Sequence, residues 1–262
     1  VSALGADEPP HSVENIDSTE SYLVEVGHKG MYAVAIGLYT NDQGEAESQK
    51  FRYQKVPLDH RFEDSPEMKQ MLADYQGELQ AFGLDGLGVK PQLHPTNAVT
   101  GGEFAGSAAC ADCHYEEYEK WETTPHAHAL QTLVDLDPAR HYDPECLSCH
   151  VTGWNPQKYH PYVTGYTSLA ATPHLNANGC ENCHGPAARH VAVENGELEL
   201  TDEENEALYE ALRLEIGENE GNQEGQTLGK AVNNCLECHD LDNSPDFDFQ
   251  EYWEQVKHGG DD

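Results

Sequence analysis

Eight cysteines and four histidines recur in this sequence with a single spacing. At residues 110–114, 146–150, 180–184 and 235–239, two cysteines are separated by two residues and followed at once by a histidine. Two thiols at this spacing can add to the two vinyl groups of one haem, and the adjacent histidine then reaches the iron. The pattern predicts four covalently bound haem c groups, each with its iron, attached through Cys110, Cys113, Cys146, Cys149, Cys180, Cys183, Cys235 and Cys238.

Two other kinds of site use paired cysteines. Four such pairs could form two structural zinc sites, and cysteines can also join in disulfides. A zinc site has no need of a histidine directly after every pair. With 15 histidines in 262 residues, finding one there four times by chance has a probability of about 10⁻⁵. A two-residue spacing also closes too short a loop to favour a stabilising disulfide. The sequence therefore favours haem attachment.

The histidines of the four motifs are the first axial ligands that this pattern predicts: His114, His150, His184 and His239. Eleven histidines remain for the opposite side of the irons, against only three methionines. Bis-histidine ligation is therefore expected, and it favours lower reduction potentials than ligation by histidine and methionine.

Three histidines stand in contexts that suit a second axial ligand. His126 follows Thr124-Pro125, a helix start that puts it on one face with Leu130 and Leu133. His190 follows the break at Gly185-Pro186, and His258 follows two aromatic residues near the end of the sequence. The ligand of the fourth iron stays open, and that iron could be five-coordinate. The competing histidines are His174, His128, His141, His160, His94 and His28.

The composition is strongly acidic. Lys and Arg number 14 against 48 Asp and Glu, a formal net charge of −34, which argues against nucleic acid or an anionic lipid surface as a partner. The acid could be a solvated, salt-adapted surface, a docking face for a basic redox protein, or a cation-bridged contact between copies. No run of 18 apolar residues is present that would span a membrane.

The cellular location follows from the attachment chemistry. Covalent haem attachment in bacteria takes place outside the cytoplasmic membrane, so we expect an extracellular or cell-surface protein, with the periplasm as the alternative. Residues from Val1 lack the features of a signal peptide, which we interpret as a mature product whose export signal was removed.

The expected fold class is α+β, with a small N-terminal antiparallel β and helix region before a helical, loop-rich tetrahaem module. Residues 1–20 indicate an extended arm, and residues 21–100 a β-rich region with one helix. The β-rich runs lie at 21–26, 31–39 and 51–56, separated by turns at 27–30 and 41–44. Apolar residues at helical spacing follow Ser65-Pro66 and include Met68 and Met71, which we assign to the core of a helix packed on that sheet.

The rest of the chain contains few long periodic segments. Residues 84–107 are rich in Gly and Pro and suggest a linker, and the tetrahaem module is assigned to residues 101–262. Thr201 and Glu204 form a capping box, and Gly217 is placed to end the helix that follows. We expect this acidic helix to be an exposed insertion between the third and fourth motifs.

Several segments together resemble the cytochrome c-554 family of multihaem cytochromes. They are GSAACADCHYEEYEKWETTPHAHAL, CLSCHVTGW, GCENCHGPAARH and YWEQVKHG, within residues 104–260. The resemblance implies four haems in stacked pairs that pass electrons, and His126 and His190 as axial ligands. The type member of that family has one five-coordinate haem, which keeps that possibility open for this chain.

A second, short resemblance lies near the beginning of the chain. The stretch VEVGHKGMYAVAIGLYTNDQG resembles the closing strands of 5′-nucleotidase-type metallophosphatases. The metal-binding Asp, Asn and His motifs of those enzymes are missing here, so phosphatase activity is not expected.

The sequence thus predicts an electron-transfer protein whose donors and acceptors are redox proteins such as other cytochromes. Copies could also stack as a homopolymer, a filament that conducts electrons, with the N-terminal arm and sheet adding strands to a neighbour. The alternative is a haem enzyme that acts on a small nitrogen compound or a peroxide at a five-coordinate iron.

Overall fold

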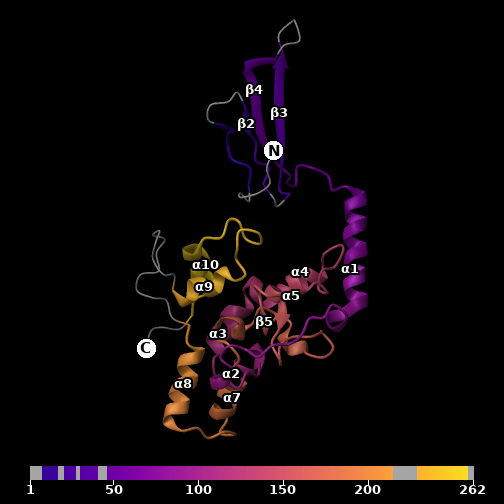
Figure 1. Ribbon diagram of the computed structural model, residues 1–262. Helices are drawn as coiled ribbons and strands as arrows, with labels where there is room; N and C mark the ends of the chain where they lie inside the picture. Colours follow the sequence, from indigo (N-terminus) through magenta and orange to yellow (C-terminus); the bar gives the residue numbers. More distant parts are fainter. Residues whose placement is uncertain (1–7, 17–20, 28–29, 41–45, 215–228, 259–262) are drawn as a thin grey trace. The chain divides into compact units, whose positions relative to one another are not determined.

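The computed structural model describes residues 8–16, 21–27, 30–40, 46–214 and 229–258. The chain divides into two compact units, Val1–Pro66 and Glu67–Asp262, drawn in Figure 1. The domain boundary expected from the sequence lies near residue 100, after the first long helix, whereas the two units divide before that helix.

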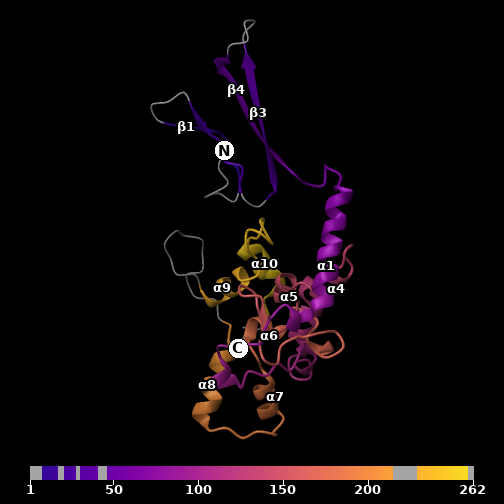
Figure 2. The same ribbon diagram turned by 45° about the vertical axis from the view of Figure 1, so that its right-hand side comes forward.

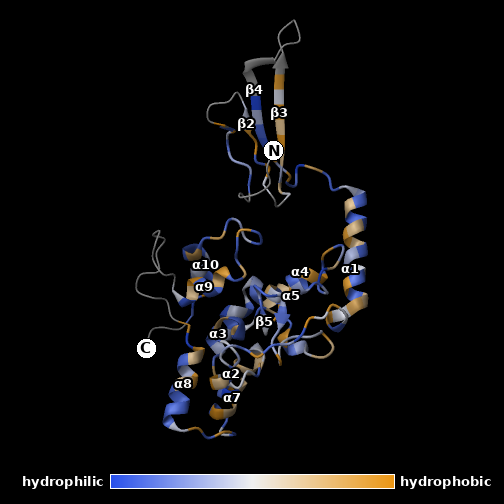
Figure 3. Cartoon of the chain, viewed as in Figure 1, coloured by the Kyte–Doolittle hydropathy of each residue, from blue (hydrophilic) through white to orange (hydrophobic). Residues whose placement is uncertain are grey.

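The first unit is built from two antiparallel strand pairs. β1 (Glu14–Asn15) pairs with β2 (Tyr22–Leu23), and β3 (Tyr32–Thr40) pairs with β4 (Ala46–Pro57). Within the described residues, the run at 21–26 thus contributes β2, which pairs with β1 of the N-terminal arm. In Figure 3, β3 is mainly apolar, and the coloured part of β4 is mainly hydrophilic. The turn expected at 41–44 and part of the turn at 27–30 lie outside the described residues.

The arm is fastened to the long hairpin. The hydroxyl of Tyr53 donates a hydrogen bond of 2.8 Å to the carbonyl of Pro10, and the Lys55 ammonium pairs with the Glu8 carboxylate at 2.9 Å. Pro9 is fully buried. Residues 8–10 are thus part of the first unit, although the sequence suggests only an extended arm there.

Helix α1 (Pro66–Gly86) begins at the proline that the sequence predicts. Its expected core positions are wrong: Met68 and Met71 are 60% and 63% exposed. The side of α1 that is buried carries Leu79 and Gln76, and the Gln76 amide donates to the Asp143 carboxylate at 3.2 Å. The predicted helical period is correct. Which of the apolar residues of α1 are buried, however, depends on contacts with the distant segment that carries Asp143.

The second unit is a succession of short helices and turns, as Figure 2 shows. The α-helices after α1 are α2 (Asn97–Thr100), α3 (Tyr115–Glu122), α4 (Ala129–Val134), α5 (Pro144–His150), α6 (Cys180–His184), α7 (Ala188–Glu194), α8 (Asp202–Leu212), α9 (Lys230–Leu236) and α10 (Phe249–Val256). Three 3₁₀ turns, η1 (Ser107–Ala109), η2 (Pro125–His128) and η3 (Pro173–Leu175), and the pair β5 (Trp154–Asn155) and β6 (His160–Pro161) complete the described part. None of the described helices is long and apolar enough to cross a bilayer.

One hydrophobic cluster holds the second unit together. Its buried members are Phe104, Leu130, Leu133, Leu147, Val151, Trp154, Tyr162, Tyr166 and Leu175. The Trp154 indole donates to the carbonyl of Tyr166 at 2.7 Å, so its buried N–H is satisfied. A Cβ on Gly165 would lie 1.9 Å from the carbonyl oxygen of Gly153, so the two segments can approach this closely only with glycine at Gly165.

Residues 84–107 belong to this unit and are not a free linker. Gln92 forms an isolated parallel bridge with Tyr162, and the Arg189 guanidinium donates to the carbonyl of Val99 at 2.6 Å. Gly and Pro residues indicate turns, but they do not show whether these turns pack against the rest of the unit.

Helix α8 is likewise attached rather than an exposed insertion. The predicted capping box is confirmed: the Thr201 hydroxyl accepts from the amide of Glu204, whose carboxylate accepts from the amide of Thr201. Leu208 of α8 is fully buried, and the helix packs against α2. It ends at Leu212, and Gly217 lies outside the described residues.

Candidate haem-binding site

Each of the four motifs forms a helical turn. The second motif lies at the end of α5, and the third is α6 itself. In the first and fourth motifs the histidine amide donates to the carbonyl of the first cysteine, at 2.8 Å for both His114 and His239. Residues three and four apart on such a turn share one face. Both thiols and the imidazole of a motif are therefore presented together.

Hydrogen bonds set the tautomer of the motif histidines. Nδ1 of His150 lies 2.7 Å from the carbonyl of Ala129, and Nδ1 of His184 lies 2.9 Å from the carbonyl of Leu212. Nδ1 of His239 lies 2.8 Å from the hydroxyl of Ser244. A carbonyl only accepts, so Nδ1 of the first two carries the proton and Nε2 keeps its lone pair for a metal. The Ser244 hydroxyl can support the same tautomer in His239.

Three of the motif histidines face a histidine from elsewhere in the sequence. The ring centroids of His114 and His190 are 6.4 Å apart, those of His239 and His126 are 6.0 Å apart, and those of His184 and His258 are 5.9 Å apart. His126, His190 and His258 are the three histidines that the sequence favours as second axial ligands. The structure thus brings each of them to a different motif.

These distances fit a metal between the two rings. Imidazole nitrogens bonded to one metal at about 2.0 Å each, with each ring centroid about 1.1 Å behind its nitrogen, give centroids about 6.2 Å apart. Burial lowers the pKa of His126, His184, His190 and His239. These rings are therefore neutral at neutral pH, the form that binds a metal. Both the spacing and the chemistry of the donors fit a bis-histidine iron.

Hydrogen bonds through Asn178 hold the segment that carries His126. The amide of Asn178 donates to the carbonyl of His126 at 3.1 Å, and the Trp121 indole donates to the carbonyl of Asn178 at 2.9 Å. The side-chain amide of Asn178 donates in turn to the carbonyl of Cys149 at 3.0 Å. The segment of His126 is therefore tied to the second motif and to the chain just before the third.

His150 differs from the other three motif histidines. Among the described residues, no histidine ring lies against it. His174 and His128, expected as candidates for the remaining ligand, are both exposed, on η3 and η2. His141 contacts the ring of Tyr142, and His160 contacts the ring of Tyr162. His28 lies outside the described residues.

The tautomer of His94 argues against it as a ligand. Its Nδ1 accepts a hydrogen bond from the amide of Thr96 at 3.2 Å, and burial lowers the pKa of His94 to about 4. The neutral ring therefore carries its proton on Nε2. Its free edge is a hydrogen-bond donor, which is the wrong form for binding a metal through that nitrogen.

The thiols of different motifs lie close together, and all eight cysteines are free of disulfides. A hydrogen bond to Cys180, together with burial, raises the pKa of Cys110. A hydrogen bond to Cys149, with burial, raises that of Cys238. Burial raises the pKa of Cys183 to about 12, and the charge of nearby Cys235 adds to this. The motifs therefore neighbour one another in the order first, third, fourth, second.

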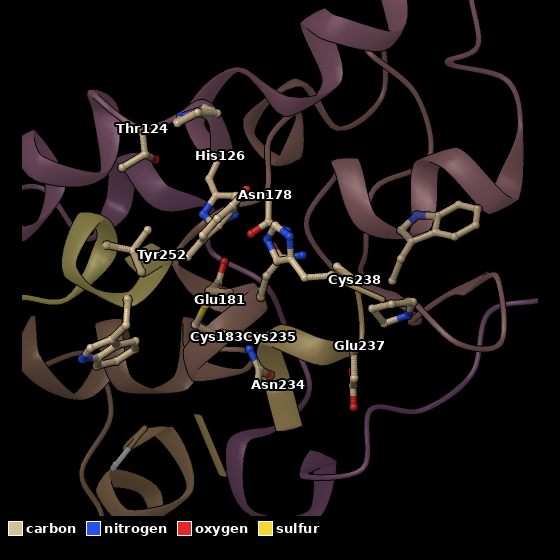
Figure 4. A pocket seen from close by; sticks show the side chains of 18 of the residues that line it. Thr124, His126, Asn178, Glu181, Cys183, Asn234, Cys235, Glu237, Cys238 and Tyr252 are labelled. Atoms are coloured by element: carbon tan, nitrogen blue, oxygen red, sulfur yellow. The ribbon is translucent and has the colours of Figure 1, made fainter. Parts of the chain in front are cut away.

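Two cavities accompany these motifs. One, of about 370 Å³, is lined by His126, His239, Cys183, Cys235 and Cys238, with Tyr252 on its wall (Figure 4). The other, of about 340 Å³, is lined by His114, His190, His184, His258, Cys110 and Cys180. Both volumes fall in the range of about 300–1,000 Å³ that is usual for ligand sites. Among the described residues, no three His, Cys, Asp or Glu side chains are grouped so as to hold a metal ion by themselves.

Two parts of the site had no signal in the sequence. The carbonyl of Leu212, which orients His184, comes from the end of α8. The buried carboxylate of Glu181 accepts from three amides near the first and third motifs. The capping box correctly predicts α8 as a helix, but nothing in the sequence marks this helix as part of the site.

Comparisons with known proteins agree with the motifs. A family model described as cytochrome c554 and c-prime matches residues 109–185, which contain the first three motifs. Cytochrome c-554 of Nitrosomonas europaea is 35% identical over 96 residues, covering 32% of this chain and 38% of that protein. The chain thus matches well under half of the length of this curated relative.

A solved structure was also found, the reduced state of cytochrome c554 from Nitrosomonas europaea. It is 24% identical and covers 59% of this chain and 83% of that one, with a TM-score of 0.33. Over its first three motifs, this chain is therefore similar to cytochromes of the c554 type.

Proposed function

We propose that this chain is a multihaem c-type cytochrome that transfers electrons through four covalently bound haems outside the cytoplasm. The observation that carries the proposal is the meeting of three motif histidines with three distant histidines at 5.9 to 6.4 Å between ring centroids. The similarity of residues 109–185 to cytochrome c554 supports the same conclusion. The bound haem iron supplies the redox chemistry, by alternating between its ferric and ferrous states.

The residues of the chain have distinct tasks in this proposal. The eight cysteines would attach the cofactors, and the four motif histidines would hold the irons. His190, His126 and His258 would hold the irons of the first, fourth and third motifs as well. The groups that contact Nδ1 of His150, His184 and His239 orient these three rings for this task.

The neighbouring thiols suggest a route. Cys110 adjoins Cys180, Cys183 adjoins Cys235, and Cys238 adjoins Cys149. Electrons would then pass between the first and second motifs by way of the third and fourth. With a net charge of −34, the chain favours docking of a redox protein with a basic face, and the rate of this docking would fall as salt is added.

The proposal is tested by haem analysis and electron paramagnetic resonance of the oxidised holoprotein. We expect four haems per chain and at least three low-spin irons. A chain isolated from a haem-maturing host with two zinc ions and no haem, or with disulfides between Cys110 and Cys180 and between Cys149 and Cys238, would contradict it.

The second motif favours a further candidate function. His150 lacks a histidine partner among the described residues, so its iron could keep an open position for a nitrogen compound or a peroxide. A high-spin iron that binds nitric oxide and turns over such a substrate would support an enzyme. Four low-spin irons would exclude it.

Assembly as a filament is the other open part of the proposal. The β3–β4 pair is a two-stranded sheet with Ile36 and Leu38 exposed, and isolated strand pairs gain stability from further strands. Electron microscopy of the native protein tests this. Dispersed monomers over a range of salt and calcium concentrations would contradict the filament. Separately, a protein found only in the periplasm would contradict the extracellular location.

A further inference from the structure

Glu181 is a buried acid at the centre of the second unit. Its side chain lies on α6, between the two cysteines of the third motif, and it is only 3% exposed. One carboxylate oxygen accepts from the amides of Ala105 at 2.9 Å and Ala187 at 2.8 Å, and the other accepts from the amide of Gly106 at 2.8 Å. Hydrogen bonds from amides favour the charged form of a carboxylate and oppose the effect of its burial.

The three amides belong to two different segments. Ala105 and Gly106 lead directly into η1 and the first motif. Ala187 precedes α7, the helix that carries His190. The backbone at Gly106 also lies against η3: a Cβ there would be 2.7 Å from the carbonyl oxygen of His174, so only glycine allows this close approach. One carboxylate therefore connects the third motif to both sides of the His114 and His190 pair.

The Glu181 carboxylate also lies beside both cavities, where its charge can act on a bound group. It lines both cavities, the one with His126 and His239 and the one with His114 and His184. Figure 4 shows it beside Cys183 in the wall of the first. Burial raises the pKa of Glu181 above its ordinary value, and the hydrogen bonds from the three amides, together with the nearby His174, oppose this rise. Among the ion pairs of the described residues, none includes Glu181, so the three amide dipoles are the main groups that offset its negative charge.

We propose that Glu181 is a positioning and potential-setting residue: it fixes the His190 segment relative to the first and third motifs, and its negative charge lowers the reduction potentials of the adjacent haems. This inference rests on the proposed haem content. The ferric state carries one more positive charge than the ferrous state, so a nearby anion stabilises the ferric state. The effect is large where water is excluded, because the effective dielectric constant is low.

Glu181→Gln tests the charge. The amide oxygen of Gln can still accept from Ala105 and Ala187, while the charge is lost. In a spectroscopic redox titration of the holoprotein, we expect four bound haems and an upward shift of at least two of the four midpoint potentials. The matched control is Glu206→Gln, which removes the same charge from an exposed position on α8 and should leave all four unchanged. Potentials equal to those of the control would overturn the inference.

Glu181→Asp tests the positioning. It keeps the charge but is too short to reach all three amides, so we expect weaker low-spin signals from the iron bound by His114 and His190. A spectrum identical to that of the wild type would contradict the positioning role. Glu181→Asn, compared with Glu181→Asp, repeats the charge test at equal side-chain length. If Glu181→Gln binds fewer haems, the midpoint potentials of Glu181→Asn and Glu181→Asp are compared instead: equal potentials in these two variants would overturn the effect of the charge.

The outcomes separate the inference from the proposed function. A wild-type chain without haem would refute the proposed function. A wild-type chain with four haems and variants with unchanged potentials would refute only the role of Glu181.

Discussion

The imidazole of His190 on α7 lies 6.4 Å, between ring centroids, from that of His114 just before α3. The two residues are far apart in the sequence, and the His190 segment is held by a hydrogen bond that the backbone amide of Ala187 donates to the buried Glu181 carboxylate. The pair is thus a product of tertiary structure, and it fits the spacing of two nitrogens bonded to one metal.

Replacing His190 with Ala should convert one low-spin iron to high spin. The His114 side of that iron would be kept, because the thiols and the motif histidine are unchanged. Electron paramagnetic resonance and the visible spectrum measure the change. His60→Ala, at an exposed histidine in the first unit, is the control and should change nothing. An unchanged spectrum in His190→Ala would remove this residue as a ligand.

The attachment motifs could be recognised from sequence because all their residues lie within one helical turn. The histidines that face the motif histidines are harder to predict from sequence. Ligation of iron by His126, His190 or His258 depends on where segments far apart in the sequence meet. Each of these histidines stands in a favourable local sequence context, and the structure brings each ring to a different motif. Their ligation of iron stays a prediction.

Other features could not have been predicted. Glu181 is one of 48 acidic residues, and only its burial and its three amide donors distinguish it. The apolar stripe of α1 has the correct period, yet Met68 and Met71 are exposed. Periodicity defines a face, but the neighbour that covers a face is set by contacts such as that of Gln76 with Asp143.

His258→Ala should open the iron at the third motif. The ring of His258 faces that of His184, and its Nδ1 lies 2.9 Å from the carbonyl of Val256, so its Nε2 is free for a metal. We expect one high-spin iron and a higher midpoint potential for it, because a donor ligand to the ferric state is lost. If His190→Ala and His258→Ala gave the same single high-spin species as the double variant, the assignment to separate irons would be wrong.

Leu208→Ala should destabilise the protein and also disturb the third motif. Leu208 is fully buried, and truncation of such a leucine costs about 2 to 5 kcal/mol of unfolding free energy. The same helix ends at Leu212, whose carbonyl orients His184, so the spectrum of that iron should broaden. Leu198→Ala, at a leucine that is 36% exposed, is the control. A loss of stability equal to the control would show that α8 does not support the site.

His94 should make the folded state sensitive to acid. Burial lowers its pKa from 6.5 to about 4, so between these values the unfolded chain binds more protons than the folded one, and stability falls as the pH is lowered. The loss contributed by this residue is complete near pH 4 and amounts to roughly 3 kcal/mol. The glutamine side chain of His94→Gln cannot be protonated in this pH range, and its side-chain amide oxygen can still accept a hydrogen bond from the backbone amide of Thr96.

The test of this pH dependence is denaturant unfolding of the wild type and of His94→Gln from pH 7 to pH 4. The other buried histidines titrate in both proteins and cancel in the difference. We expect the wild type to lose more stability than the variant over this interval, with most of the difference arising between pH 6.5 and pH 4. Parallel stability curves for the two proteins would mean that His94 is protonated as easily in the folded chain as in the unfolded one, and the tautomer assigned from Thr96 would then be wrong.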